Sequence, residues 1–375
     1  MRSLDPAPLA RLWSTVREIS PDAIARDAER VFTILICGRA GAGKRTLRAA
    51  LAGAMPLDLV TPYVRVVDGV PADTYGASIG LWVADTSAAP DATEWRDALA
   101  LASRLPTMVY VLNKADRARH LEAIRRTAVT ALGSSASGRL VVLSADDART
   151  VNNALTPVLL EAVPELRLAI ARRMPVFRDT AARQVILEAS RTNAELALVS
   201  SLPASVPLVN IAVAGADTIV LTKNQAMLLL KLAALHGRTV SSPFRLIAEI
   251  APVVGASFLW RTIARAAVGL LPGYVSAVPK AAVAYVGTYV VGTAAHYYYR
   301  LGVRPSGEVV ESYAREASEL ARQWIAQTAP KLIEAPSRAT SRIAETLRRR
   351  RRPDGLIELP PPISRLGGDP EVPTT

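Results

Sequence analysis

The sequence is short of aromatic residues, cysteine and histidine. Phe, Trp and Tyr together make up 5% of its 375 residues, and Cys37 is the one cysteine. A single thiol cannot build a disulfide framework, which argues against a small secreted scaffold and favours a reducing cytosol. The three histidines, His120, His236 and His296, lack the spacing of a metal-binding motif. No basic segment followed by an apolar stretch opens the chain, so we expect no signal peptide.

Acidic residues are scarce in the most hydrophobic third of the chain. The net charge is +12, and residues 201–300 carry eight Lys or Arg but only two acids, Asp217 and Glu249. A segment that is both basic and apolar favours an anionic membrane surface as its partner, and nucleic acid as the second choice.

The length suggests about two or three domains, and the order of the apolar runs places them. Residues 1–30 have apolar residues at helical spacing and predict an amphipathic helical segment. Residues 31–163 alternate strand-like and helix-like runs, which predicts an α/β domain with a mostly parallel sheet and helices on both faces. The expected strands are 31–37, 63–68, 79–84, 107–112 and 139–143. The expected helices are about 44–54, 91–104, 116–132 and 147–163.

The rest of the chain has helical patterns. Residues 164–201 predict one connecting helix, and residues 202–303 predict an all-α hydrophobic domain. Residues 304–352 predict an amphipathic and basic helical segment that ends in five consecutive arginines. The Pro-rich residues 353–375 are expected to be disordered.

A glycine-rich segment joins the first expected strand to the first expected helix. Backbone N–H groups of such a segment point inward at the positive end of the helix, where they bind phosphate. Lys44 follows the last glycine, so its ammonium can reach the β- and γ-phosphates of a nucleotide. A strand–helix turn without a ligand is the alternative. The candidate phosphate-binding residues are Gly38, Arg39, Ala40, Gly41, Ala42, Gly43, Lys44, Arg45 and Thr46.

The position after Lys44 departs from the phosphate-binding pattern. The pattern has Ser or Thr there because the hydroxyl ligates Mg²⁺, whereas this chain has Arg45 and places its hydroxyl at Thr46. One residue along a helix is a rotation of about 100°, so Thr46 is expected to point elsewhere. Either Arg45 supplies positive charge in place of the metal or Mg²⁺ binds poorly, and both weaken hydrolysis more than binding. We therefore assign no metal ligand.

A second polar segment, Asn113–Asp116, follows the fourth expected strand. The Asp116 carboxylate can accept two hydrogen bonds from N1 and N2 of guanine, which adenine does not offer. Asn113 is expected to tie this segment to the glycine-rich one, and Lys114 to cover the base with its aliphatic stem. The residues after the fifth strand fit a third loop that contacts guanine O6. An aspartate that caps a helix is the alternative for Asp116. The candidate guanine-binding residues are Asn113, Lys114, Asp116, Ser144 and Ala145.

The stretch of sequence that would contain the γ-phosphate-sensing switches of a GTPase is short. Lys44 and Asp68 are 24 residues apart, too few for a first switch and a strand of its own. Asp68 is the best candidate for the second switch, although the following glycine is misplaced, and Thr61 is a candidate switch threonine. Asp85 follows the next strand, where we expect it to have no catalytic role.

On these residues, 31–163 resembles the Era-like branch of the translation-factor-related (TRAFAC-class) P-loop GTPases. The matching segments are Gly38–Lys44, Asn113–Asp116 and Ser144–Ala145. The resemblance implies a G domain that binds GTP or GDP, with weak or atypical hydrolysis and weak support for Mg²⁺. Era-like proteins often bind RNA as well, but this sequence has no Gly-x-x-Gly loop of the K-homology type.

Residues 202–300 resemble the YcjF-type domain, also called domain of unknown function 697, which often follows such a G domain in bacteria. Three places carry the resemblance: Ile219–Met227, Leu271–Gly273 and the Ala/Gly/Tyr-rich helix around Thr288, Gly292 and Tyr298. The resemblance implies an all-helical, membrane-associated module and supplies no catalytic residues.

The uncharged run 281–299 bears on the membrane question. It approaches the roughly 20 apolar residues of a spanning helix, and it ends in three tyrosines followed by Arg300, which suits a lipid interface. Membrane insertion or a re-entrant hairpin, peripheral binding to a surface, and a soluble bundle rich in Ala and Val all fit it.

These patterns together predict a guanine-nucleotide-binding protein whose nucleotide state regulates a membrane-associated helical domain. We expect it at the cytoplasmic face of the inner membrane, with an anionic membrane or a membrane protein as partner. The alternatives are a catalytically inactive scaffold, an RNA-associated assembly factor and a soluble cytoplasmic location.

Overall fold

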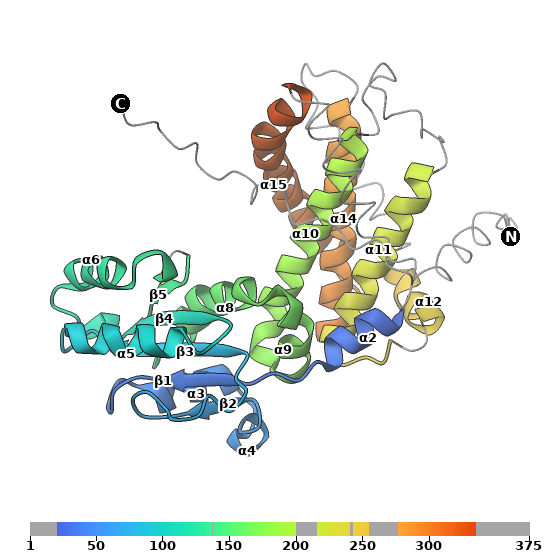
Figure 1. Cartoon of the computed structure of the whole chain (residues 1–375). Helices are drawn as coiled ribbons and strands as arrows, with labels where there is room; N and C mark the ends of the chain where they lie inside the picture. Colours follow the sequence, from blue (N-terminus) through green and yellow to red (C-terminus); the bar gives the residue numbers. More distant parts are fainter. Residues whose placement is uncertain (1–20, 137, 200–215, 241–242, 255–276, 335–375) are drawn as a thin grey trace, which may run out of the picture. The chain divides into compact units, whose positions relative to one another are not determined.

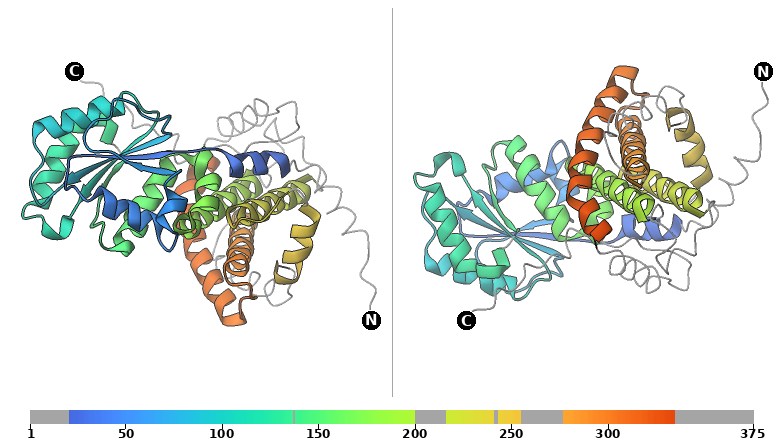
Figure 2. Two further views of the ribbon diagram at one scale, coloured as in Figure 1. Left: turned by 90° about the horizontal axis from the view of Figure 1, so that it is seen from below. Right: turned by 90° about the horizontal axis from the view of Figure 1, so that it is seen from above.

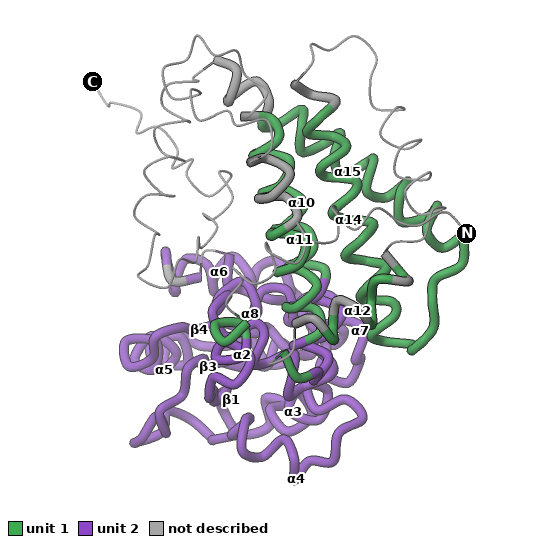
Figure 3. The backbone as a smooth tube through the Cα atoms, turned by 90° about the vertical axis from the view of Figure 1, so that its right-hand side faces the viewer, with its two compact units in different colours: residues 1–24, 183–233, 239–375 green, residues 25–182, 234–238 purple. Residues whose placement is uncertain are grey.

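A computed structural model describes residues 21–136, 138–199, 216–240, 243–254 and 277–334 (Figure 1). The chain forms two compact units, which Figure 3 distinguishes by colour. The α/β unit comprises residues 25–182 and 234–238. The helical unit comprises the described parts of residues 1–24, 183–233 and 239–375. The predictions for residues 1–20, for Leu271–Gly273, for the five arginines and for the Pro-rich tail fall outside the described residues.

The sheet of the α/β unit has five parallel strands in the order β2-β1-β3-β4-β5 (Figure 1). All five lie on the predicted runs, so the expected α/β fold is confirmed, and the sheet is wholly parallel. Cys37 ends β1 fully buried, and burial raises the pKa of its thiol to about 11. The strands are β1 (Ile34–Cys37), β2 (Val64–Val66), β3 (Ile79–Asp85), β4 (Met108–Asn113) and β5 (Leu140–Val142).

Helices cover both faces of this sheet, as predicted (Figure 2). On one face, Trp82 and Tyr110 pack against α5 (Ala92–Ala102) and α6 (Leu121–Leu132). On the other face, α3 (Lys44–Ala52) contacts β1, and α8 (Thr156–Ala162) contacts β4. Strands buried on both faces are apolar along their whole length, which explains why the sequence shows them so clearly. The shorter helices of this region are α2 (Pro21–Glu29), α4 (Leu57–Val60), η1 (Ala115–Arg117), η2 (Gly133–Ala136), α7 (Ala148–Thr150) and the π-helical η3 (Val151–Leu155).

The connecting segment is not the single helix expected within residues 164–201, so that prediction is wrong. Pro175 has no N–H to donate to a preceding turn, and Met174 before it adopts an extended conformation, with φ −121° and ψ 96°. The chain therefore breaks between two helices. The boundary between the units then falls at Arg183, inside the second of them, rather than at residue 163. The elements are η4 (Pro164–Leu166), α9 (Arg167–Arg173), η5 (Pro175–Phe177) and α10 (Arg178–Val199).

The helical unit packs through small residues. An added Cβ at Gly292 would lie 2.9 Å from Ile186 Cγ1 and 3.1 Å from Leu228 Cδ2, so three helices approach closely at this glycine. The last helix, which ends at Glu334 in the described residues, lies within 304–352, where the sequence predicts an amphipathic helical segment. Besides α10, the helices in the described part of this unit are α11 (Ala216–Leu235), α12 (Pro243–Val254), α14 (Ala277–Leu301) and α15 (Gly307–Glu334).

Buried polar side chains join the same three helices. The Asn193 amide of α10 donates to the Thr288 hydroxyl of α14 at 2.9 Å, and the Asn224 amide of α11 donates to Asn193 Oδ1 at 2.8 Å. All three residues are buried. Because an unpaired polar group would be costly in this interior, the network favours one register of the three helices over shifted ones.

The prediction that residues 281–299 could span a membrane is not supported. Among the residues that the structure describes, no helix is both long and apolar enough to cross a bilayer. The run is uncharged but only weakly apolar, because it contains two glycines, two threonines, a histidine and several tyrosines. Gly292 of this run lies at a close contact between helices.

Replacing Glu195 with glutamine is expected to stabilise the protein at pH 8 but not at pH 5. Burial raises the pKa of the Glu195 carboxyl to about 7 from 4.5, and the neighbouring Arg191 opposes this shift only partly. Below pH 4.5 the carboxyl is neutral in both folded and unfolded chains. Between pH 4.5 and about 7 the unfolded chain releases this proton while the folded chain keeps it, so stability falls by up to about 3 kcal/mol and stays lower above pH 7. Urea unfolding of the full chain at the two pH values measures the difference.

The half-buried Glu188, on the same helix, supplies the control. The difference between the effects at pH 5 and pH 8 should be larger for Glu195→Gln than for Glu188→Gln. Equal effects of Glu195→Gln at pH 5 and pH 8 would show that this carboxyl does not titrate in the interior.

Candidate functional site

The predicted site residues lie on loops that leave the carboxyl ends of the strands. β1 and β3 are neighbours, yet the chain leaves β1 toward β2 on one side and β3 toward β4 on the other. Parallel α/β proteins bind ligands outside the strand ends at such a reversal. The glycine loop (residues 38–44) and the β3–α5 loop (residues 86–91) flank this point.

The glycine loop depends on glycine at two positions where other chain segments approach it. A Cβ on Gly38 would lie 2.2 Å from the Val83 carbonyl oxygen, and a Cβ on Gly43 would lie 2.3 Å from Asn113 Nδ2. Both glycines have positive φ, 140° and 90°. Gly43 is the N-cap of α3 and offers no side-chain cap, so first-turn N–H groups stay available to an anion.

Lys44 is 4% exposed and folds back over the glycine loop. Its ammonium donates to the carbonyl oxygens of Gly38, at 2.9 Å, and Arg39, at 2.5 Å. It also lies 2.6 Å from Asp68 Oδ1. The hydrogen bond from Lys44 lowers the pKa of Asp68, so this carboxylate stays ionised at neutral pH. The ammonium thus sits within the loop, held by a carboxylate.

The Asn113 side chain connects its own loop to the glycine loop and to the loop after β5. It is 2% exposed. Its amide nitrogen donates to the Ala42 carbonyl oxygen at 2.8 Å, and its amide oxygen accepts from the Ala145 backbone N–H at 2.8 Å. The contact with the glycine loop that the sequence predicted is confirmed. A substitution of Asn113 would remove the side-chain hydrogen bonds that join the three loops.

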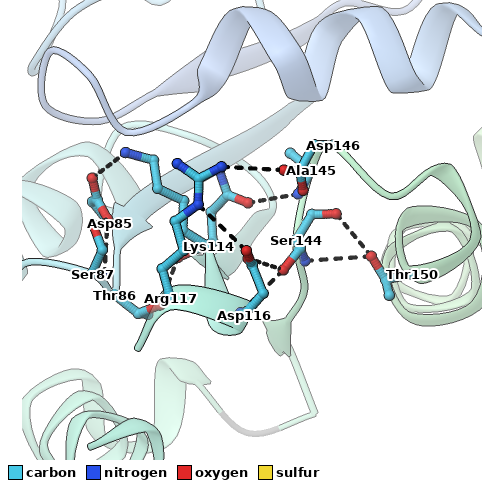
Figure 4. A network of polar contacts seen from close by, with 11 residues as sticks. Asp85, Thr86, Ser87, Lys114, Asp116, Arg117, Ser144, Ala145, Asp146 and Thr150 are labelled. Carbon is cyan, nitrogen blue, oxygen red and sulfur yellow. Dashed lines mark hydrogen bonds and ion pairs between the residues drawn. The ribbon is translucent and has the colours of Figure 1, made fainter. Parts of the chain in front are cut away.

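The Asp116 carboxylate is held by the loop after β5 (Figure 4). Ser144 donates its hydroxyl to Asp116 Oδ1, and Arg117 Nε donates to Oδ2 at 3.4 Å. The hydrogen bond from Ser144 is the main reason why the pKa of Asp116 is lowered. Ser144 is in turn fixed by Thr150, whose hydroxyl donates to the Ser144 carbonyl oxygen at 2.8 Å. An ionised, half-exposed acceptor is thereby held in one orientation.

Lys114 pairs with Asp85, a contact that the sequence did not predict (Figure 4). Burial acts to raise the pKa of Asp85, but hydrogen bonds from Lys114 and Ser87 outweigh it and lower the pKa. Thr86 donates both its backbone N–H and its hydroxyl to the Asn113 carbonyl oxygen, at 3.0 and 2.7 Å. The start of the β3–α5 loop is therefore bound to the Asn113 segment.

Of the two candidate switch residues, Asp68 contacts the glycine loop and Thr61 does not. Asp68 contacts the glycine loop through Lys44, and the Gly69 N–H donates to the Gly38 carbonyl oxygen at 2.8 Å. Thr61 instead ends α4, where its hydroxyl accepts from Arg48 Nη2 at 2.6 Å and donates to the Leu57 carbonyl oxygen at 2.9 Å. The structure thus brings Asp68, and not Thr61, to the loop.

The position after Lys44 offers no hydroxyl to a Mg²⁺ ion. Arg45, where the pattern requires a hydroxyl, is exposed, and so is Thr46. Within the described residues, no cluster of three or more His, Cys, Asp or Glu could hold a metal ion. A cation beside the glycine loop opposes binding of a second, divalent one.

No protein-family model matches the chain, and no curated protein matches it significantly.

Proposed function

We propose that the α/β unit binds a guanine nucleotide, GTP or GDP, as an Era-like G domain does. The phosphate chain would lie on the glycine loop, and the guanine edge would face Asp116. The observation that carries the proposal is Asn113, which bonds the Ala42 carbonyl of the first loop and the Ala145 N–H of the third. Two loops that bind the opposite ends of one ligand must be held at a fixed separation, and this amide holds them.

The choice of guanine rests on the chemistry of Asp116. An ionised carboxylate accepts hydrogen bonds and donates none, and the pKa of this one is lowered. It therefore favours a base edge that presents two donors side by side. Guanine presents N1–H and N2–H₂ in this way, whereas adenine presents an acceptor at N1.

Direct titration tests the proposal. The full chain is titrated with GTP, GDP, ATP and guanosine by calorimetry, each with excess Mg²⁺ and again with EDTA. We expect GTP and GDP to bind and ATP to bind at least about tenfold more weakly, which corresponds to about 1.4 kcal/mol. Failure of both guanine nucleotides to bind would refute the proposed function.

Turnover is proposed to be slow because Arg45 occupies the metal-ligating position. Replacing Arg45 with serine should make GTP binding depend on Mg²⁺ and raise steady-state GTP hydrolysis several-fold, because a hydroxyl replaces a repelling cation. Phosphate release measured with and without Mg²⁺ tests this. Arg45→Ala removes the charge without adding a ligand and is the matched control. Equal rates for the serine and alanine variants would show that the hydroxyl is not what the site lacks.

The helical unit is proposed to act at an anionic membrane, at the cytoplasmic face of the inner membrane, under control of the nucleotide. The support is charge: residues 201–300 carry eight basic and two acidic residues, and Arg245, Lys280 and Arg300 are exposed. Flotation with vesicles containing phosphatidylglycerol, compared with neutral vesicles, tests surface binding with GTP and with GDP. Equal recovery with both vesicle types would refute an electrostatic membrane partner.

A further inference from the structure

An ion pair joins the two loops that flank the reversal of strand order. Arg39 belongs to the glycine loop, and Asp91 is the last residue of the β3–α5 loop. Arg39 Nη1 lies 3.0 Å from Asp91 Oδ2, and Nη2 lies 2.7 Å from Oδ1. This two-bond geometry is the strongest form of guanidinium–carboxylate contact. It crosses the position outside β1 and β3 where the phosphate chain is proposed to lie.

Asp91 is held in place independently of Arg39. Its Oδ1 accepts the Glu94 backbone N–H at 2.9 Å and so caps the N-terminus of α5. The Glu94 carboxylate lies behind the guanidinium, with Oε2 3.7 Å from Arg39 Nε, and its side chain is 5% exposed. The hydrogen bond from Arg39 is the largest cause of the lowered pKa of Asp91. The capping bond therefore fixes the Asp91 carboxylate whether or not Arg39 is bound to it.

The cations of the glycine loop are thus matched by carboxylates. Lys44 is paired with Asp68, and Arg39 is paired with Asp91. The loop consequently presents less positive charge to an incoming anion than its basic residues imply. Two oxygens of a phosphate present a pair of adjacent acceptors, as a carboxylate does, so they can replace Asp91 as the partner of the guanidinium.

We propose that Asp91 sets the affinity of this site for the phosphate chain by competing with it for Arg39. In the free protein Asp91 holds the guanidinium, and a polyphosphate bound on the glycine loop takes it over. Asp91 then keeps only its capping bond to α5. This inference rests on the proposed function, because it assigns a role at the same site. Asp91 is a positioning residue that acts through Arg39.

Opposite shifts in two variants test the proposal. Asp91→Ser keeps an N-cap acceptor but is too short to hold the guanidinium, so Arg39 becomes free. We expect the affinity for GTP to rise about three- to tenfold, the affinity for GDP to rise less, and the affinity for guanosine, which has no phosphate, to stay the same. The titrations are done at low salt, because salt screens exposed charges. Arg39→Ala leaves Asp91 unopposed and should lower GTP affinity by a similar factor. Glu122→Gln, which removes one acidic charge from the exposed face of α6, should leave all three affinities unchanged.

Two further measurements separate the possible failures. Asp91→Asn removes the charge while keeping a longer cap, so it replaces the serine variant if that variant is unstable in thermal unfolding. Inorganic tripolyphosphate is titrated beside the nucleotides. If the wild type ignores GTP and GDP but binds tripolyphosphate more tightly after Asp91→Ser, the proposed function fails and the competition stands. If neutralising Asp91 leaves GTP and tripolyphosphate affinity unchanged or lower, the competition is refuted.

Discussion

Lys44→Ala is expected to lower the affinity for GTP and GDP by about 100-fold or more. The Lys44 ammonium is held within the glycine loop by two carbonyl oxygens and by Asp68. In the proposed complex it exchanges part of this shell for phosphate oxygens, and charge-assisted hydrogen bonds contribute about 1.5–3 kcal/mol each. The alanine variant loses these bonds and also leaves the Asp68 carboxylate unneutralised beside the phosphates. Calorimetric titration with GDP measures the loss.

The contribution of the unneutralised Asp68 carboxylate can be measured separately with Asp68→Asn. In the Lys44→Ala background, neutralising Asp68 should restore part of the lost affinity, because it removes the repulsion but not the missing ammonium. Arg126→Ala, on the exposed surface of α6, controls for a general loss of positive charge. Wild-type affinity in the Lys44→Ala variant would place the phosphate chain elsewhere.

Asp116→Asn is expected to exchange guanine selectivity for xanthine selectivity. The carboxylate accepts from two guanine donors, whereas the asparagine amide offers one acceptor and one donor, which suits the N1–H and carbonyl O2 of xanthine. GDP affinity should fall by roughly 10- to 100-fold, and XDP should become the preferred diphosphate. Competition between GDP and XDP for a fluorescent nucleotide gives the ratio directly.

The neighbouring Asp146 supplies a matched control for this change. It lies in the loop after β5, half-exposed, 3.5 Å from Arg117. Asp146→Asn removes the same charge from the same surface but is proposed to face no base donor, so the GDP to XDP ratio should stay as in the wild type. If both variants shift the ratio equally, general electrostatics rather than Asp116 selects the base.

The sequence was sufficient for the parallel sheet and for the polar loops that meet at its edge. Its strands are buried on both faces, so they appear as uninterrupted apolar runs, and the polar segments that follow them must gather at one edge of the sheet. Asn113 was predicted to bind the glycine loop because both of their motifs follow strands that end at the same edge of the sheet. The structure confirms this with the hydrogen bond from Asn113 to Ala42.

Only the tertiary structure decided which charges pair across that edge and where the units divide. Arg39 and Asp91 are 52 residues apart in sequence, and nothing in either local pattern indicates that β1 and β3 are neighbours. Likewise, the uncharged run in α14 is similar in composition to a weak membrane span, and only the close contacts of Gly292 with Ile186 and Leu228 show what it packs against. The periodicity of a helix or strand depends on residues two to four positions apart, so the sequence specifies it directly. Pairings between distant residues arise only when the strand order brings them together.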